Sequence, residues 1–353
     1  MMDNLKVGNV YKNVLIGKDN YLFLYDGGQQ QIAHLIGEKY PSVESVCNFY
    51  ENIYNRQLYC KFKNIKYLHL IYPSKPVICI NKLPEDLADK VNSLYYYQYY
   101  KFIKNRDFIF INNQCINVKE IKEKIFYPYF LLKNLNNDNS VFRILDTHCN
   151  DYGFIQIAKY ILLLLDLENN VEYFFVKKQQ KIGGDLANMI KSNLKADEVI
   201  YSYSPPPPQH INIKNEITID NRIFLPSNSN TIKICYNPNS IYTQRLLIFG
   251  DSFINATIIF LKPFFRDILY IRSTTFQTDI IELFSPDVII SSNAERYLSK
   301  VENDKNSNMY LMELYGDKNY HPTHDFKAAL TAQLSYKHHK NIYDDWINNI
   351  NKN

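Results

Sequence analysis

Two short segments of the sequence contain residue types that could carry out nucleophilic catalysis. Ser252 lies in GDSF, directly after the apolar run RLLIF, while Asp146 and His148 lie in RILDTHCNDYG. A serine on a tight turn after a hydrophobic strand presents its hydroxyl at the edge of a sheet, and an aspartate two positions before a histidine can orient the imidazole. Together the segments predict a Ser-His-Asp hydrolase or acyltransferase.

The residues around Ser252 predict a strand, a turn and a helix. Residues 246–249 have the pattern of a buried strand, Gly250 permits the turn, and NATIIFLKPFF follows with a helical pattern. At the start of that helix the backbone N–H groups and the helix dipole can stabilise a developing oxyanion, which makes the Ser252 amide the expected donor. The structural alternative is an ordinary glycine turn in which Asp or Ser caps the helix.

Asp146 and His148 are expected at the end of a strand formed by RIL, ahead of a helix that begins near Asn150 and Gly153. Residues two apart on an extended segment point to the same side, so Asp146 would accept the Nδ1 proton of His148 while Nε2 faces Ser252. Taken alone, a histidine near a strand end is more often a satisfied polar residue than a catalyst. The two segments are therefore more informative together than apart.

Length and composition exclude several classes of protein. The chain has 353 residues, 46% of them apolar, and a formal net charge of +4, so it can bury a large core and has no basic stripe for a nucleic acid. Its 6 cysteines are widely spaced, with no C-x-x-C pair and no histidine at ligand spacing, so we expect free thiols and no metal site. The mild basicity would suit an anionic substrate.

The N-terminal sequence and the apolar runs bear on localisation. The first residues lack the basic, apolar and small-residue regions of a secretory signal, and the run YILLLLDL at 160–167 is too short to span a bilayer. We therefore expect no transmembrane segment and a cytoplasmic protein, or a periplasmic one if a leader has been removed.

Short runs rich in Ile, Val, Phe and Tyr alternate with longer helical patterns, which predicts an α/β fold around a mainly parallel sheet. The predicted strands are 14–16, 22–24, 67–72, 108–111, 171–176, 199–203, 246–249, 268–271 and 288–291. The predicted helices are 40–55, 85–103, 117–125, 152–167, 184–193, 253–264, 278–284 and 293–301.

Two regions depart from this alternation. At about 204–232 a run of prolines at 205–208 precedes the alternating string INIKNEITI, which predicts an inserted β segment ahead of the nucleophile strand. Further on, DFKAALTAQLSYKHH and NIYDDWINNI predict two helices of a C-terminal appendage, with Trp346 as a packing anchor. We therefore expect a catalytic domain over 1–304 and a helical appendage over 305–353.

Several collinear blocks of the sequence resemble the SGNH-like alginate O-acetyltransferase family (AlgX/AlgJ-like), whose members acetylate bacterial exopolysaccharides. The family's hallmarks are a D-T/H-H-W-N-x-x-G segment upstream of a GDSF block, and this chain has DTHCNDYG at 146–153 and GDSF at 250–253. Looser matches, in the right order, are VLIGKDNYLFLYDGG near the start, YPSKPVIC at 72–79, GGDLANM at 183–189 and SPDVIISSNAERYL at 285–298.

The resemblance implies an SGNH-hydrolase-like (flavodoxin-like) fold in which Ser252, His148 and Asp146 form the catalytic triad. Two positions depart from the family's pattern, because Cys149 and Tyr21 stand where it usually has Trp. Loss of two aromatic rings at a carbohydrate-facing site would alter sugar stacking. The family's particular polysaccharide is therefore not carried over to this chain.

Ordinary SGNH hydrolases keep an Asp-x-x-His pair near the C-terminus, commonly followed by Pro, so GDKNYHPTHD at 316–325 offers a rival acid and base. Asp317 and His321 are one residue too far apart for that pattern, although His321-Pro322 fits it. A helix cap with histidines on a solvated loop explains the same segment without catalysis. We favour the upstream pair and keep this one as the alternative.

Five further residues are candidates for oxyanion stabilisation or substrate binding: Gly184, Asp251, Arg272, Asn293 and Lys75. Gly184 could bring a second backbone N–H near the oxyanion, and Asp251 is expected to order the nucleophile turn by hydrogen bonding. Lys75 is a candidate contact for a substrate anion. The structural alternatives are a helix cap for Asn293, a surface ion pair for Arg272 and a solvated side chain for Lys75.

These observations predict an O-acetyltransferase that moves an acetyl group through a Ser252 acyl-enzyme to a hydroxyl of a bacterial surface polysaccharide or its precursor. We expect no tightly bound cofactor and acetyl-CoA as the acyl donor of a cytoplasmic enzyme. Two alternatives stay open: a carbohydrate esterase that uses the same triad with water as the acceptor, and a non-catalytic glycan-binding protein on the same fold.

Overall fold

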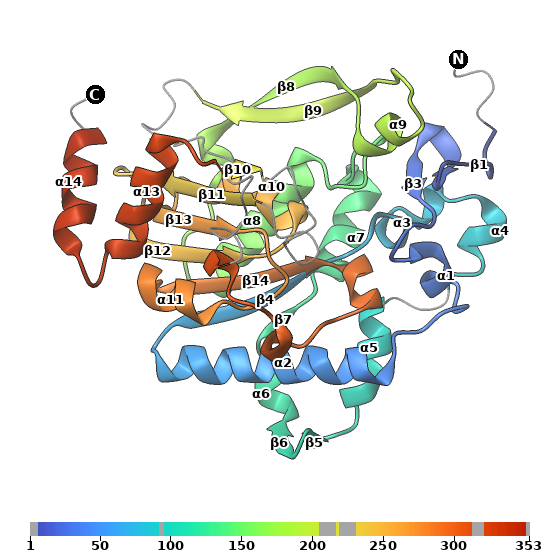
Figure 1. The fold of residues 1–353 in the computed structure, drawn as a ribbon. Helices are drawn as coiled ribbons and strands as arrows, with labels where there is room; N and C mark the ends of the chain where they lie inside the picture. Colours follow the sequence, from blue (N-terminus) through green and yellow to red (C-terminus); the bar gives the residue numbers. More distant parts are fainter. Residues whose placement is uncertain (1–5, 92–94, 205–216, 219–230, 313–320, 351–353) are drawn as a thin grey trace. The chain divides into compact units, whose positions relative to one another are not determined.

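The computed structural model describes residues 6–91, 95–204, 217–218, 231–312 and 321–350 (Figure 1). Their contacts divide the chain into two compact units, and each is described by itself. The His148 unit is drawn from 1–51, 71–204 and 294–301, and the Ser252 unit from 52–70, 205–293 and 302–353. This division differs from the predicted boundary at residue 304, because both units combine segments that lie far apart in the sequence.

The Ser252 unit is built on a sheet whose central strands are parallel. The strand order includes β10-β11-β13-β12-β14-β4; β12 pairs in parallel with β13 and β14, whereas β11 pairs antiparallel with β13, and β10 with β11. The bounds are β4 (Lys66–Tyr72), β10 (Ile217–Thr218), β11 (Thr231–Tyr236), β12 (Tyr242–Phe249), β13 (Phe265–Ile271) and β14 (Val288–Ala294). The predicted mixed α/β structure with a central, mostly parallel sheet is confirmed.

The helices of this unit include one that begins at the predicted nucleophile. Those with described bounds are α10 (Ser252–Leu261), α11 (Thr278–Phe284), α13 (His324–Ser335), α14 (Lys340–Ile350) and residues 52–62 of α2 (Val43–Phe62). Trp346 of α14 packs edge-on against Tyr236 of β11, with ring centres 5.7 Å apart, in keeping with its predicted packing role. None of the helices in the described ranges combines the length and apolarity that crossing a bilayer requires.

The strands of the His148 unit, apart from a short one at 125–126, form small antiparallel sheets, which helices accompany. Its strands are β1 (Val10–Tyr11), β2 (Val14–Ile16), β3 (Leu22–Leu24), β5 (Phe108–Ile111), β6 (Gln114–Asn117), β7 (Ile125–Phe126), β8 (Phe175–Ile182) and β9 (Ala196–Tyr203). Its helices include residues 43–51 of α2 and α1 (Gln31–Leu35), α3 (Lys75–Ile78), α4 (Glu85–Ala88), α5 (Tyr95–Ile103), α6 (Val118–Lys122), α7 (Tyr129–Asp138), α8 (Asp151–Leu164) and α9 (Asp185–Met189). Buried apolar residues of β2, β3 and α9 pack with Leu145, next to the predicted catalytic aspartate.

Several elements differ from the sequence-based expectation. Residues 171–174 of the predicted strand 171–176 form a 3-10 helix (Val171–Phe174), and β8 begins at Phe175. The rest of β8 was not predicted, because its exposed lysines and glutamines do not alternate with apolar residues. The predicted helix 293–301 is the end of β14 followed by a 3-10 helix (Glu295–Ser299). Helix α7 was not predicted, because its asparagines are weak helix formers.

Most of the predicted insertion at 204–232 lies outside the described residues, and so does the proline run at 205–208. Within it, Ile217 and Thr218 form β10, which pairs antiparallel with β11. The insertion itself stays a prediction.

A buried ion pair ties the C-terminal helices to the sheet of the Ser252 unit. Arg245 of β12 and Asp267 of β13 are 1% and 0% exposed, and Nη1 of Arg245 lies 2.8 Å from Oδ2 of Asp267. The guanidinium lies 3.9 Å from the ring centre of Tyr336 and donates to the main-chain carbonyl of Gln333. Asp267 also accepts from the hydroxyl of Tyr343 at 3.0 Å. The residues predicted as an appendage therefore pack into this unit through polar side chains that carry no apolar signal.

Asp267→Asn is expected to lower the free energy of unfolding by about 3–5 kcal/mol, because it leaves the buried Arg245 guanidinium without its counter-charge. Urea denaturation followed by circular dichroism measures this loss. Asp344→Asn is the matched control, since Asp344 is an exposed residue of the same helix as Tyr343 and should change stability by less than about 0.5 kcal/mol. If both substitutions had the same small effect, the ion pair would not hold the helices.

Candidate active site

The segment around Asp146 is a tight loop rather than a strand. A single bridge pairs Phe142 with Cys149, and the Arg143 N–H donates to the His148 carbonyl at 3.2 Å. Inside the loop the His148 N–H donates to Oδ1 of Asp146 at 2.9 Å, which is an Asx turn: the side chain bonds the main chain two residues on. The expected extended segment is wrong, because Asp146 and His148 meet through a turn and not through strand alternation.

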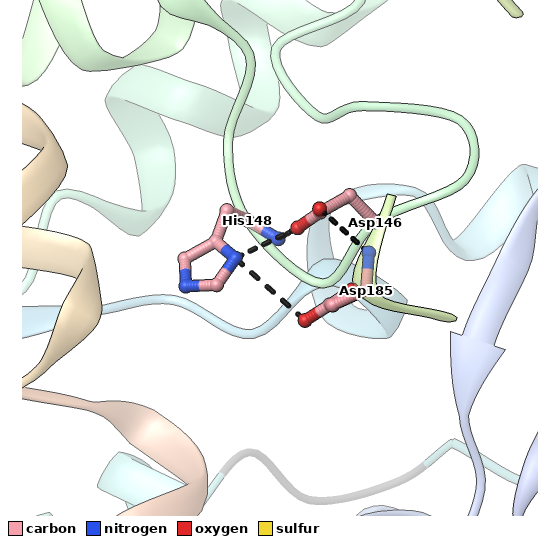
Figure 2. Close-up of side chains that lie close together, drawn as sticks. All are labelled: Asp146, His148 and Asp185. Atoms are coloured by element: carbon pink, nitrogen blue, oxygen red, sulfur yellow. Dashed lines mark hydrogen bonds and ion pairs between the residues drawn. The ribbon is translucent and has the colours of Figure 1, made fainter. Parts of the chain in front are cut away.

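The imidazole of His148 faces two carboxylates (Figure 2). Its Nδ1 lies 2.7 Å from Oδ1 of Asp146 and 3.8 Å from Oδ2 of Asp185, while Nε2 lies on the opposite side of the ring. An acceptor this close to Nδ1 favours the tautomer with its proton there, and Nε2 then becomes the nitrogen that can accept a proton. The His148 side chain is 23% exposed, so reactants can approach it.

Asp185, the first residue of α9, is a member of this site that the sequence did not predict. Its N–H donates to Oδ2 of Asp146 at 2.9 Å, and its own carboxylate accepts from the N–H and the hydroxyl of Thr147. Both oxygens of Asp146 therefore accept hydrogen bonds, so the carboxylate is held against His148. The GGDL block indicates a helix start. Nothing in the sequence links it to the loop at 146–148.

Asp146 is stabilised as a carboxylate in spite of its burial. Burial raises its pKa, but the hydrogen bond and charge of His148 and the N–H groups of His148 and Asp185 lower it by more. The net pKa lies below the ordinary value of 3.8. Asp146 is thus anionic at neutral pH and can stabilise the imidazolium that forms when His148 takes a proton.

Gly184 permits a close approach between α9 and the loop. A Cβ at this position would lie 2.1 Å from the Leu145 carbonyl oxygen and 2.8 Å from Cβ of Asp146. Only a glycine leaves room for the main chain there, and this approach brings the next N–H, that of Asp185, to the Asp146 carboxylate. The contacts give Gly184 a packing role, and its role as an oxyanion donor stays a prediction.

Lys75 is neither solvated nor available to a substrate anion. It is 3% exposed, and its Nζ donates to the carbonyl oxygens of Leu22, Ile144 and Asp146 at 2.7, 2.9 and 2.9 Å. An ammonium has three donors, and all three are used. Both sequence-based interpretations of Lys75 are therefore wrong, since a lone lysine between polar and proline residues gives no sequence signal of burial.

The two positions at which this chain departs from the family's Trp pattern are also buried. Tyr21 is 7% exposed and its hydroxyl lies 2.9 Å from Oγ of Ser140, while Cys149 is 0% exposed. Neither side chain faces a carbohydrate, so the expected loss of sugar stacking at these positions is wrong. They fill the interior behind the loop at 146–148.

Ser252 occupies the strand-turn-helix junction that the sequence predicts. Its half-buried side chain belongs to the first residue of α10, and Oδ1 of Asp251 caps that helix by accepting from the Phe253 N–H at 2.9 Å. The hydroxyl of Tyr270 donates to the carbonyl oxygens of Gly250 and Asp251 at 3.1 and 3.0 Å. Asp251 thus orders the turn, as expected, and the whole turn is fixed by hydrogen bonds.

Arg272 and Asn293 share the sheet edge at which Ser252 lies. The parallel strands β12, β13 and β14 end side by side, with Phe249 in register with Ile271 and Ser291. Ligands of open α/β sheets bind at the carboxyl ends of the strands. This edge of the Ser252 unit is therefore where its chemistry-bearing residues gather.

The side chains of Arg272 and Asn293 differ from their structural alternatives. Among the described residues, no carboxylate forms an ion pair with Arg272, and its Nε is buried without an acceptor. Asn293 lies inside β14, while the cap of the following 3-10 helix is Ala294. The predicted surface ion pair and helix cap are both wrong, and a substrate-binding role for the two residues stays a prediction.

His69 is a buried histidine near the same sheet edge. Its Nδ1 lies 2.8 Å from Oγ of Ser291, and the residue is 4% exposed. Burial, aided by the charge of Arg56, lowers its pKa to about 3. His69 is therefore a neutral structural imidazole at physiological pH.

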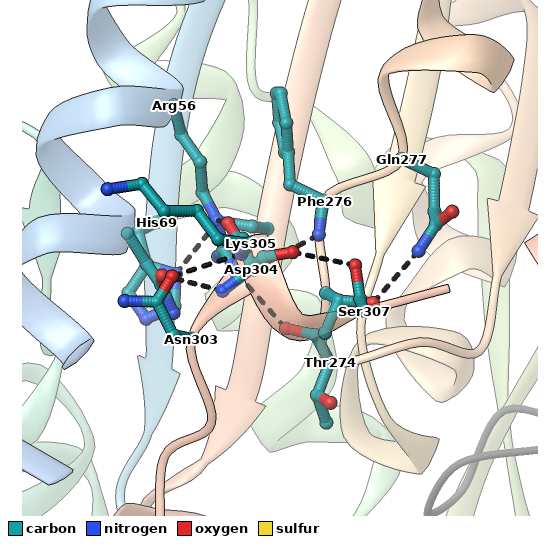
Figure 3. Close-up of polar contacts among 12 residues, drawn as sticks. Arg56, His69, Thr274, Phe276, Gln277, Asn303, Asp304, Lys305 and Ser307 are labelled. Atoms are coloured by element: carbon teal, nitrogen blue, oxygen red, sulfur yellow. Dashed lines mark hydrogen bonds and ion pairs between the residues drawn. The ribbon is translucent and has the colours of Figure 1, made fainter. Parts of the chain in front are cut away.

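A hydrogen-bonded network beside His69 holds the segment after residue 301 in place (Figure 3). Arg56 of α2 binds Asp304 through both carboxylate oxygens at 2.6 and 2.7 Å and donates to the Thr274 carbonyl at 3.1 Å. The Asp304 N–H donates to Oδ1 of Asn52 at 2.9 Å. These bonds satisfy the buried guanidinium and give the network a structural role.

The rival acid and base fall only in part within the described residues: Asp317 lies outside them, and His321 is exposed. Thr323 caps α13 by accepting from the Phe326 N–H, as the structural alternative for this segment predicts.

Asp146, His148 and Asp185 are also the residues, within the described ranges, whose donor atoms lie close enough to share a metal ion, all within 4.8 Å of one another. Both oxygens of Asp146 already accept N–H donors, and the Asp185 carboxylate already accepts from Thr147. The arrangement is thus satisfied as an orienting network for the imidazole without a cation.

No family model and no curated protein matches the sequence. Solved structures similar to this chain include a DHHW family protein from Eubacterium siraeum, with 15% identity, a TM-score of 0.55 and coverage of 86% of this chain and 98% of that one. Bacillus cereus PatB1 has 12% identity, a TM-score of 0.52 and coverage of 84% and 98%. The O-acetyltransferase domain of Pseudomonas putida AlgJ has 15% identity, a TM-score of 0.48 and coverage of 85% and 97%.

The solved structures found include one that carries the name of the family that the sequence resembles, the AlgJ domain. The likeness to PatB1 and to the DHHW family protein, at 12% and 15% identity, is one of fold. It extends over 98% of each of these two chains. The chain therefore shares the fold of PatB1 and of the DHHW family protein.

Gly184→Ala is expected to destabilise the protein by about 1–3 kcal/mol, because the new methyl group would overlap the Leu145 carbonyl and push the Asp146 loop away. Gly183→Ala is the matched control, since a Cβ there meets its nearest neighbour, the Leu194 carbonyl, at 3.4 Å. Thermal denaturation of both variants measures the difference. Equal melting temperatures would contradict the close approach.

His69 is expected to keep the NMR shifts of a neutral imidazole between pH 5 and 8. Its folded pKa lies below the unfolded value of 6.5, so the unfolded chain binds a proton that the folded one does not, and stability falls as pH drops from 6.5 toward 3. Histidine-selective ¹⁵N labelling, with His69→Gln for assignment, measures the titration. A titration midpoint of His69 between pH 5 and 8 would contradict the burial of a neutral ring.

Proposed function

We propose that this chain is a serine O-acetyltransferase whose acceptor is a bacterial surface polysaccharide or its precursor. Ser252 is the nucleophile, His148 the general base and Asp146 the residue that orients the base. The proposal rests on the geometry within each unit. That Ser252 and His148 act together is inferred from the sequence resemblance, in which the matching residues belong to one triad.

The observation that carries the proposal is the hydrogen bond of 2.7 Å between Nδ1 of His148 and Oδ1 of Asp146. A carboxylate held at this distance selects the imidazole tautomer that can act as a base through Nε2 and stabilises the charge that develops there. The Asp146 carboxylate is held in this position, because its second oxygen accepts a hydrogen bond from the Asp185 N–H. A merely structural histidine does not need a carboxylate fixed from both sides.

Ser252 has the second property that the reaction requires. It is the first residue of α10, a helix of 10 residues whose start is capped by Asp251. An oxyanion formed at the serine would lie near the positive end of the helix dipole, which stabilises negative charge. Arg272 and Asn293 at the same sheet edge are the proposed side chains for binding substrate.

The chemistry then follows in two balanced steps. In the first, Nε2 of His148 takes the Ser252 proton as Oγ attacks the acetyl carbonyl; the leaving group of the donor departs with that proton and acetyl-serine remains. In the second, His148 takes the proton of a sugar hydroxyl, which attacks the ester, and Ser252 regains a proton as it leaves. We propose acetyl-CoA as the donor, its thiol being the first leaving group.

The test is mass spectrometry of the intact protein after exposure to acetyl-CoA, followed by addition of an oligosaccharide acceptor. The wild-type protein should gain one acetyl group at Ser252 and lose it faster when acceptor is present. Ser252→Ala should gain none and should lose about 10⁴-fold or more of the transfer rate while keeping the wild-type melting temperature. Ser273→Ala, at the same sheet edge but bonded to Thr275, is the matched control and should transfer normally.

The same experiment separates the alternatives. Acetyl loss that is equally fast with water and with acceptor would indicate an esterase. Bacillus cereus PatB1 has also been solved with a sulfonyl adduct, which makes sulfonyl fluorides suitable reagents here. Full transfer by Ser252→Ala would refute the proposal, and binding of glycan without any acyl or sulfonyl adduct would indicate a non-catalytic protein.

A further inference from the structure

We propose that Lys75 is a positioning residue of the active site, whose ammonium fixes the main chain of the catalytic loop on both sides of Leu145 and thereby sets the place of the Asp146 carboxylate. The inference deepens the proposed function, on which its kinetic part rests.

The contacts of Lys75 converge on this loop. Of its three N–H donors, two bind the carbonyl oxygens of Ile144 and Asp146, and the third binds the carbonyl of Leu22 in β3. The Ile144 carbonyl also accepts the Leu22 N–H at 3.0 Å, so β3 and the loop are joined by main-chain and side-chain bonds together. One cation thus ties the loop to a strand that contributes no catalytic group.

The ammonium is held in a site that suits a cation. Its Nζ lies 5.1 Å from the ring centre of Tyr21 and 5.2 Å from that of Phe23, within the range of cation–π attraction. Three carbonyl dipoles point at the charge. Burying an ammonium costs several kcal/mol, and an apolar side chain of similar length would fill the space without that cost. Packing alone therefore does not account for a lysine here.

The residue is also fixed from its own main chain. Ser74, directly before it, donates its N–H to Oε2 of Glu295 at 2.9 Å, and Glu295 is 0% exposed. The other oxygen of Glu295 accepts from the hydroxyl of Tyr127 at 2.8 Å. These bonds hold the start of α3 in place. The main chain of Lys75 is therefore restrained, as its ammonium is.

The action of Lys75 on catalysis is indirect. It touches the carbonyl of Asp146, not its carboxylate, and the carboxylate is placed by the Asx turn whose main chain Lys75 holds. If the loop moves, Oδ1 of Asp146 and Nδ1 of His148 separate. A displacement of about 1 Å in a catalytic constellation costs about 10²-fold in rate.

The test compares Lys75→Met with Lys82→Met. Lys82 is a matched control because its Nζ also lies near the Tyr21 ring, at 5.6 Å, but it pairs with Asp19 and not with the loop. Two readouts are taken on each variant. One is the rate of acetyl transfer, resolved into kcat and KM. The other is the downfield ¹H resonance of the His148 Nδ1 proton in ¹⁵N-histidine-labelled protein, assigned with His148→Gln.

We expect Lys75→Met to lower kcat by about 10²-fold with KM within about twofold, and to shift the Nδ1 proton upfield or lose it to exchange with water. Lys82→Met should match the wild-type protein in both readouts. A folded Lys75→Met protein with wild-type kcat and an unchanged resonance would overturn the proposal. If Lys75→Met fails to fold, Lys75→Arg is used in its place. A planar guanidinium does not direct three donors at the three carbonyls as an ammonium does. A wild-type resonance and rate in Lys75→Arg would therefore also overturn the positioning role.

The two readouts keep this inference apart from the proposed function. A protein without acetyl transfer whose Nδ1 resonance still responds to Lys75→Met would refute the proposed function and support the positioning role. Normal transfer by the wild-type protein with no response of the resonance would refute the positioning role alone.

Discussion

The hydrogen bond between Asp146 and Nδ1 of His148 is the interaction on which the proposed chemistry of this protein depends. It requires that one carboxylate be held within 2.7 Å of one ring nitrogen in a loop with no regular secondary structure. The loop meets this requirement through an Asx turn at Oδ1 and an N–H of α9 at Oδ2. Each oxygen of Asp146 is thereby committed, and the imidazole is left with one defined orientation.

Much of the surrounding structure serves that loop. Gly184 lets α9 approach the Leu145 carbonyl, and the Asp185 carboxylate holds Thr147 inside the loop. Behind the loop, Asn150 caps α8 by accepting from the Gly153 N–H at 2.9 Å and donates to the Ser140 carbonyl at 2.7 Å. The DTHCNDYG segment is thus one structural unit: a turn that contains the proposed base, followed by a helix whose capped start fixes the turn.

The sequence predicted regular elements and local junctions better than long-range contacts. The strand-turn-helix at Ser252 is where the pattern places it, because a buried strand, a glycine and a helix cap are local signals. The contact between Asp146 and His148 was also predicted, but for the wrong reason, since strand alternation and an Asx turn bring the same two residues together. The sequence did not predict Asp185 as a site residue, nor the contact of Lys75 with the loop, because these two residues lie 39 and 71 positions from Asp146. The sequence likewise predicted the C-terminal helices as an appendage, because contacts distant in the sequence give no local signal. These helices bind Arg245 and Asp267, two polar residues of the sheet strands.

The most direct test of the catalytic role of this hydrogen bond is the rate at which a sulfonyl fluoride labels Ser252 in the wild-type protein and in His148→Gln and Asp146→Asn. The label reports nucleophilicity without knowledge of donor or acceptor, and peptide mass spectrometry identifies its position. We expect a single adduct at Ser252 in the wild-type protein and labelling slowed by about 10²-fold or more in both variants, which retain the serine but lack the oriented base. Labelling of Ser252 at one rate in all three proteins would contradict the assignment of His148 as its base.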